Sequence, residues 1–315
     1  MSDPMTILQA NKYYFLKGGA ERYMLELSRW LESQGHTVVP FAMDHPDNLP
    51  TSHAKYFVSQ VPTSESEFPT LPKGGLGGVA SRFLTFGRML YSLEARRNLA
   101  TLITHTKPDL CHIHSIYTQI SPSILDTLRD QHVPVVMTVH DHHLVSPQYN
   151  IWAPGCGKDY RDVGLVRGSL SRYHKHSLLG SFAQTFAYKV HRALRIYGRG
   201  VDMFICPSQY MKRQLVLGGF SESKIRVVPF GINARLLEPR YNRGSYFLFV
   251  GRLSEEKGIE TIVHAAGLLP DLVFKIVGRG PRMEHLHRLA DGLANVEFLG
   301  YRDGEELRDL YRGTR

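Results

Sequence analysis

Short apolar runs of strand length alternate with segments of helical periodicity along the chain. The run from Thr6 to Ala10 precedes a helical stripe that ends near Gly35, and the run TVVPFAM follows it. Strands that alternate with helices in this way form parallel sheets whose faces the helices cover. The pattern therefore predicts an α/β fold. Further strands are expected at DLCHIH, PVVMTVH and VDMFICPS.

Two long helices are expected between these strands. Apolar residues at helical spacing predict the first from Val79 to about His105. The second, SFAQTFAYKVHRALRIYGR, is amphipathic and ends the basic segment 158–200, where nine Lys or Arg accompany two acids. This helix either packs on the core or docks on an anionic membrane surface. No recognisable nucleic-acid-binding module accompanies the charge, so nucleic acid is not an expected partner. The predicted apolar face comprises Phe182, Phe186, Val190, Ala193, Leu194 and Tyr197.

The chain is too long for a typical single domain, since it has 315 residues. The segment RLLEPRYNRG resembles a linker, because loop formers and polar residues dominate it. We therefore expect an N-terminal domain over residues 1–235 and a second domain over residues 243–315. The strands expected in the second domain number about half of a six-stranded doubly wound sheet, and they are Tyr246–Val250, Val273–Val277 and Val296–Leu299.

Charge and cysteine content narrow the class of protein. The formal net charge is +9, which favours an anionic partner, although charge alone does not choose among a nucleotide, a phospholipid headgroup and nucleic acid. Three widely spaced cysteines argue against a disulfide framework. No apolar run reaches membrane-spanning length, and the opening MSDPMTILQA lacks the pattern of a signal peptide. A cytoplasmic location is therefore expected.

The segment YFLFVGRLSEEKG carries the clearest ligand signal. An apolar strand stops at Gly251, and a helix begins near Gly258. Arg252 and Lys257 lie between them, where backbone N–H groups and the helix dipole already favour phosphate. The segment therefore predicts a diphosphate clamp. The alternative is a solvated loop with scattered charges.

Glycines mark two further turns of the same kind. Gly18 and Gly19 precede the first helix, where a missing Cβ lets a bound group approach the backbone. The pattern is not GxGxxG, so a dinucleotide site is weakly supported. Gly278 and Gly280 follow a strand in the second domain.

The strand PVVMTVH ends in a polar cluster. His140 and Asp141 stand where the carboxyl end of a parallel strand faces ligands, and they could orient a sugar hydroxyl or a proton. We give His142 and His143 less weight. Adjacent histidines in a turn cannot all face one ion, so no metal site is expected.

Together, GGAE, the His-Asp pair, VVPFGIN, FVGRLSEEKG and KIVGRGP resemble the GT-B glycosyltransferases of family 4 (group 1). The resemblance implies two Rossmann-like, doubly wound domains, the second incomplete here. It also implies a retaining, metal-independent transferase without a cofactor. Such an enzyme moves a sugar from a nucleotide-diphosphate donor to a lipid-linked or polysaccharide acceptor in cell-surface polysaccharide synthesis, in the cytoplasm or at the inner membrane face.

The resemblance also assigns roles to residues of this chain. Arg252 and Lys257 would bind the donor diphosphate, and His140 with Asp141 would lie at the transferred sugar. The glycines assigned to the diphosphate site are Gly18, Gly19 and Gly251, and those expected next to the donor are Gly278 and Gly280.

One departure from the family pattern affects the expected activity. The family continues with two glutamates eight residues apart that contact the donor sugar and ribose, whereas this sequence ends at LRDLYRGTR. We therefore expect a truncated chain with weak or no transferase activity. The alternative function is that of a non-catalytic remnant that binds acceptor or membrane. A GT-B epimerase or phosphorylase is a third, weaker alternative.

Overall fold

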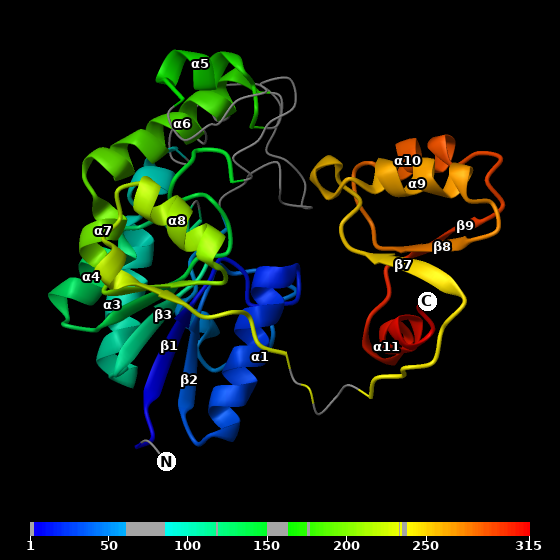
Figure 1. Ribbon diagram of the computed structural model, residues 1–315. Helices are drawn as coiled ribbons and strands as arrows, with labels where there is room; N and C mark the ends of the chain where they lie inside the picture. The colour runs from blue at the N-terminus through cyan, green and yellow to red at the C-terminus, as the bar shows by residue number, and fades with distance from the viewer. Residues whose placement is uncertain are drawn as a thin grey trace. The chain divides into compact units, whose positions relative to one another are not determined.

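The computed structural model divides by its contacts into a first unit, Met1–Phe230, and a second unit, Gly231–Arg315. Each unit combines helices with a parallel sheet (Figure 1), which confirms the predicted α/β class. The contacts place the boundary after Phe230, whereas the sequence places it between residues 235 and 243. The structure describes residues 3–60, 86–117, 119–149, 163–174, 177–232, 234 and 238–315.

The first unit is built on a six-stranded parallel sheet with the order β2-β1-β3-β4-β5-β6. The strand order reverses between β1 and β3, because β2 lies on one side of β1 and the later strands lie on the other. Ligands of open α/β sheets bind at the carboxyl ends of the strands at such a point. The strands are β1 (Thr6–Ala10), β2 (Thr37–Phe41), β3 (Leu110–Ile113), β4 (Val135–Thr138), β5 (Met203–Cys206) and β6 (Ile225–Val227).

Helices cover this sheet and bury it on both faces. Successive residues of β1, from Ile7 to Ala10, are all at most 5% exposed, so Ile7, Leu8 and Ala10 are apolar and Gln9 is a buried polar residue. Leu8, Ile113 and Phe204 belong to one continuous core. The helical elements are α1 (Gly19–Ser33), η1 (Ala54–Tyr56), α3 (Leu93–Thr106), α4 (Ile124–Asp130), α5 (Leu165–Leu170), α6 (Leu178–Ala193), α7 (Ile196–Gly200), α8 (Gln209–Leu217) and η2 (Glu222–Lys224).

The predicted continuous helix from Val79 to His105 is wrong. Its residues 79–85 lie outside the described part, and Ser92 interrupts the remainder with extended backbone. The Ser92 hydroxyl accepts a hydrogen bond from the Ala95 N–H at 3.1 Å, so it caps α3. The Ser92 N–H donates in turn to the Ser121 hydroxyl at 3.0 Å. A distant serine therefore fixes the helix start.

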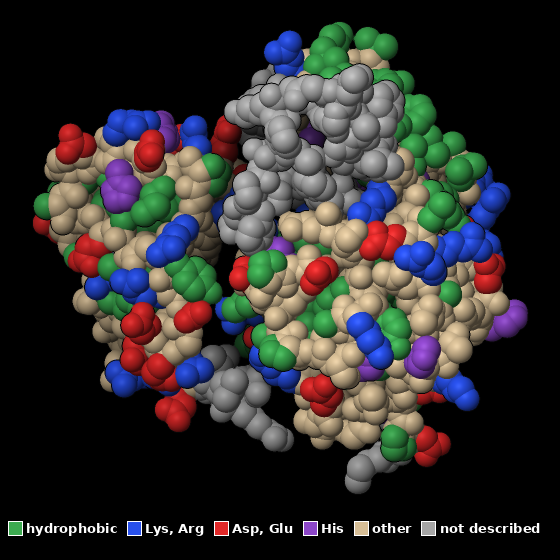
Figure 2. Space-filling view, turned by 180° about the vertical axis from the view of Figure 1, so that it is seen from behind, with side chains coloured by type: hydrophobic (Ala, Val, Ile, Leu, Met, Phe, Trp, Pro, Cys, Tyr) green, Lys and Arg blue, Asp and Glu red, His purple; other side chains and the backbone are tan. Residues whose placement is uncertain are grey.

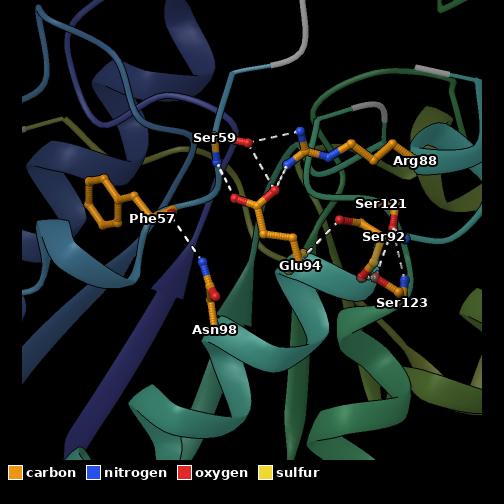
Figure 3. A network of polar contacts seen from close by, with 9 residues as sticks. Phe57, Ser59, Arg88, Ser92, Glu94, Asn98, Ser121 and Ser123 are labelled. Carbon is orange, nitrogen blue, oxygen red and sulfur yellow. Dashed lines mark hydrogen bonds and ion pairs between the residues drawn. The ribbon is translucent and has the colours of Figure 1, made fainter. Parts of the chain in front are cut away.

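Figure 3 shows a second set of polar contacts at the same helix start. The Glu94 carboxylate forms an ion pair with Arg88 and accepts a hydrogen bond from the Ser59 N–H at 2.7 Å. One turn later, the Asn98 amide donates to the Phe57 carbonyl at 3.2 Å. The first turns of α3 thus hold the chain segment that follows η1.

The predicted amphipathic helix differs from the structure in two ways. It is not continuous, because α6 ends at Ala193 and Arg195 adopts a left-handed conformation with φ 52° before α7 begins. Its predicted apolar face is buried only in part, since Tyr197 is 8% exposed whereas Phe182 and Leu194 are 39% and 54% exposed. The side chains that α6 buries are those of Ser181, Gln184, Thr185, Ala187 and Tyr188.

Close packing against α5 explains this orientation of α6. A Cβ on Gly168 of α5 would lie 2.7 Å from the Thr185 hydroxyl oxygen. The two helices therefore approach through small and polar side chains. Three apolar side chains in the first part of α6 are left exposed, namely Leu178, Leu179 and Phe182.

The second unit contains a three-stranded parallel sheet, β7-β8-β9. Figure 1 shows α9 and α10 on one face of this sheet and α11 on the other. The three strands predicted for this unit are confirmed. Its small core consists of Leu253, Ile259, Val263, Ile276 and Leu286. The elements are β7 (Tyr246–Val250), η4 (Glu255–Lys257), α9 (Ile259–Leu268), β8 (Val273–Val277), α10 (Met283–Leu289), β9 (Val296–Gly300) and α11 (Gly304–Arg312).

Candidate functional site

A hydrogen-bonded chain of side chains crosses the sheet of the first unit and ends at His140. His114 Nε2 lies 2.7 Å from the Gln9 amide oxygen, and His114 Nδ1 lies 2.9 Å from His140 Nε2. In the orientation in which the Gln9 side-chain oxygen accepts, His114 carries its proton on Nε2 and accepts at Nδ1. His140 then donates through Nε2 and keeps a lone pair on Nδ1. His140 was predicted from the sequence, whereas Gln9 and His114 were not.

Burial keeps these histidines neutral. It lowers the pKa of His140 to about 4 and that of His112 to about 4. His114 is fully buried, and its pKa lies well below the usual value, mainly through burial and then through its two histidine neighbours. At neutral pH the site therefore presents an uncharged imidazole that can accept a hydrogen bond at His140 Nδ1.

Aromatic rings enclose His140. The Tyr23 ring of α1 packs edge-on at 5.6 Å between ring centroids, and the Phe230 ring lies at 5.4 Å. Tyr23 and Phe230 also contact each other at 4.5 Å. An apolar enclosure around one polar atom is typical of small-molecule sites.

The structure separates the predicted His140–Asp141 pair. Among the described residues, the Asp141 carboxylate accepts a hydrogen bond from the His143 N–H at 2.8 Å and bonds with the Tyr117 side chain. Burial raises the pKa of Asp141 to about 6, although these hydrogen bonds oppose the rise. The Tyr117 ring stacks on the His143 ring at 4.3 Å. Asp141 therefore organises the loop after β4, and His140 points elsewhere.

Asn11 links the ends of β1 and β3, and the sequence analysis missed it. Its side-chain oxygen accepts from the Ser115 N–H at 3.0 Å, and its amide donates to Glu21 at 3.3 Å. Its place directly after a buried strand is the feature of the sequence from which this residue could have been predicted. This residue therefore ties the strand ends to the first turn of α1.

Gly18 and Gly19 lie at the beginning of α1. Gly18 is the N-cap residue, and Gly19 is the first residue of the helix. A Cβ on Gly19 would meet no described atom within 4 Å, so packing does not require glycine there. The missing side chain instead leaves free space in front of helical N–H groups.

In the second unit, Arg252 and Lys257 follow β7 as predicted, and both are exposed. Neither forms an ion pair with a described residue. Lys257 ends η4, and Gly258, which has φ 65°, is the N-cap residue of α9. Two free cations therefore stand beside Gly251 and a helix N-terminus.

Gly278 and Gly280 are required for packing within this unit. A Cβ on Gly278, which has φ 138°, would lie 1.8 Å from the Gly251 carbonyl oxygen. A Cβ on Gly280 would lie 2.2 Å from the Leu253 carbonyl oxygen. The two glycines thus let the loops after β7 and β8 pack backbone to backbone. The donor contact predicted for them stays a prediction.

The described residues show no group of three or more His, Cys, Asp or Glu side chains that could hold a metal ion. Within the same part of the chain, no helix combines the length and apolar character needed to cross a membrane.

Comparisons with known proteins identify relatives of this architecture. An uncharacterized protein of the cps region of Klebsiella pneumoniae is 23% identical over 304 residues, which are 94% of this chain and 74% of that protein. Sucrose-phosphate synthase from Thermosynechococcus elongatus superposes with a TM-score of 0.63 at 18% identity, over 98% of this chain and 74% of that one. HepE of Anabaena, solved in complex with UDP and glucose, superposes with a TM-score of 0.57 at 15% identity. The superposition covers 97% of this chain and 71% of HepE.

Family comparison covers nearly the whole sequence. Residues 238–315 match the family described as Glycosyl transferases group 1. Residues 17–236 match the family described as Glycosyltransferase Family 4. The chain therefore belongs to glycosyltransferase family 4 and has the GT-B fold of these transferases.

Proposed function

We propose that this protein is a retaining glycosyltransferase that uses a nucleotide-diphosphate sugar and a lipid-linked or polysaccharide acceptor, without a metal ion. The observation that carries the proposal is the pair of free cations Arg252 and Lys257 beside Gly251 and the start of α9. HepE, a structural relative, binds UDP. The Klebsiella relative belongs to a cps region, which supports a role in surface polysaccharide synthesis.

The proposed chemistry follows from where charge develops. Departure of the sugar increases the negative charge on the leaving diphosphate, and fixed cations stabilise this charge more in the transition state than in the ground state. In the first unit, neutral His140 accepts a hydrogen bond from a sugar hydroxyl at Nδ1. Gly19 leaves space for a ligand at the N-terminus of α1.

Calorimetric titration of UDP and GDP into the whole chain tests the clamp. We expect binding to weaken by about 100-fold or more in the Arg252→Ala, Lys257→Ala variant, since each charge-assisted hydrogen bond contributes about 1.5–3 kcal/mol. Arg288→Ala, which removes an exposed cation from α10, is the matched control and should bind normally. Equal affinities of wild type and double variant would refute the clamp. Nucleotide binding without sugar transfer would favour the non-catalytic alternative.

The surface of α5 and α6 suits an anionic membrane leaflet. Figure 2 shows hydrophobic side chains gathered where these helices lie. Val166, Leu170 and Leu179 are 73%, 66% and 64% exposed, and the sequence from 163 to 200 contains no Asp or Glu. We propose that this surface binds membrane, because exposed apolar side chains and surface cations both favour an anionic leaflet.

Vesicle co-sedimentation tests this membrane contact. We expect the chain to sediment with phosphatidylglycerol-containing vesicles and to lose most of this binding when Leu178, Leu179 and Phe182 are all changed to Gln. Each lost apolar side chain removes about 1.5–3 kcal/mol of burial. The control is Leu217→Gln on α8, which changes a side chain that is 71% exposed. Loss of binding in the control alone, or in neither variant, would contradict the proposal.

A further inference from the structure

The first unit contains a pocket of about 450 Å³ between α6, α7 and the end of α8. This volume lies within the usual range for small-molecule sites. Leu144, Ala187 and Phe220 supply apolar wall, while Tyr117 and His143 form the side nearest the loop after β4. The Gln184 side chain of α6 lies 2.6 Å from His143, so this helix is tied to that loop.

The pocket is electropositive. Arg192, Arg195 and Arg199 line it, and none of them forms an ion pair with a described residue. His191 and His143 also line it, and its lining residues include no Asp or Glu. Three guanidinium groups around one cavity, without a described carboxylate paired to them, favour a phosphate or another compact anion.

The pocket adjoins the loop that carries the candidate reaction residues. Asp141 bonds with Tyr117 and with the His143 N–H, and both of those residues line the pocket. Asp141 immediately follows His140 in the chain. A ligand in the pocket would therefore contact the loop that His140 begins.

The helix that forms the pocket also carries the apolar surface. α6 contributes Tyr188 and Arg192 to the pocket, while its exposed side chains include Leu179 and Phe182. One helix thus presents cations to a cavity and apolar side chains to the outside. This combination fits a ligand with an anionic head and an apolar stem.

We propose that this pocket binds the phosphate ester group of a lipid-linked acceptor. The inference rests on the proposed transferase function and names the acceptor class for it. The arginines bind the phosphate, and the apolar wall contacts the first carbons of the stem. The acceptor sugar or hydroxyl is thereby held next to the loop of His140.

Titration with farnesyl phosphate, followed by tryptophan fluorescence or calorimetry, tests the pocket in the whole chain. We expect binding that weakens about 100-fold or more in Arg192→Gln, Arg199→Gln, because two charge-assisted hydrogen bonds are lost. Lys189→Gln is the matched control, since Lys189 is exposed on the same helix and does not line the pocket. It should change affinity by less than about twofold.

Four outcomes would overturn the proposal. Two concern farnesyl phosphate itself: no binding, or unchanged binding in the arginine variant. Equally tight binding of inorganic phosphate would assign the pocket to a free anion, and equal binding of farnesol would exclude a phosphate site. UDP titration of the Arg252 and Lys257 variant reports on the donor clamp alone, so failure of the pocket and failure of the proposed function remain distinguishable.

Discussion

Replacing Gly278 by alanine is expected to destabilise the second unit by about 3 kcal/mol or more. Two independent costs add at this position. The φ of 138° is one that only glycine adopts readily, and the new Cβ would lie 1.8 Å from the Gly251 carbonyl oxygen. That oxygen belongs to backbone and cannot rotate away as a side chain would. Its residue is also fixed by the hydrogen bond from the Gly251 N–H to the Val277 carbonyl at 3.0 Å.

Hydrogen exchange of the β7, β8 and β9 amides measures this effect directly, since it reports on the second unit separately from the first. Gly267→Ala provides the control. Gly267 lies in α9, and a Cβ there would make ordinary contact with Leu293 at 3.7 Å, so this change should stabilise the helix by about 0.5–1 kcal/mol. Unchanged protection in Gly278→Ala would show that the two loops do not pack as described.

Acidification from pH 7 to pH 4 is expected to lower the free energy of unfolding of the first unit. His112 and His140 have folded-state pKa values of about 4, and that of His114 is also lowered, against 6.5 in the unfolded chain. Depressed pKa values contribute stability that is complete above pH 6.5 and is lost as the pH falls toward 4. Asp141 acts in the opposite direction, because its pKa is about 6 in the folded state against 3.8 in the unfolded chain. Its contribution to the stability is therefore present at low pH and is lost as the pH rises through 6.

Near pH 5 the unfolded state binds about three more protons at the three histidines, and the folded state binds about one more at Asp141. The unfolded state therefore binds a net two protons more than the folded state. The slope is then about 2.7 kcal/mol per pH unit at its steepest, near pH 5. Urea unfolding followed at several pH values measures it. His112→Gln should reduce the slope by about one proton, or about 1.4 kcal/mol per pH unit. His105→Gln, at an exposed position, should leave it unchanged, and equal slopes for all three proteins would refute the assignment.

Much of the fold could be predicted because burial on both faces of a parallel sheet leaves a continuous signal. Thr6–Ala10 and Tyr246–Val250 are strands over the residues that the apolar runs indicated. The start of α3 could not be predicted, because the Ser92 cap depends on Ser121, a partner far away in sequence. The orientation of α6 depends on α5, which the periodicity did not reveal.

The candidate site was predicted in part for the same physical reason. A polar residue that follows a buried strand is visible in sequence, as His140 and Arg252 are. Contacts across the sheet are not visible, because they depend on register. Gln9 meets His114 only because β1 pairs with β3 so that Gln9 lies opposite His112.

The backbone around Arg252 is held on both sides before any ligand arrives. The Gly251 N–H donates to Val277 and the Leu253 N–H donates to Arg279, each at 3.0 Å. The Lys257 N–H donates to the Ser254 carbonyl at 3.0 Å, which closes the turn into η4. The loop is therefore preorganised, so binding of an anion requires the ordering of two side chains rather than of a whole loop.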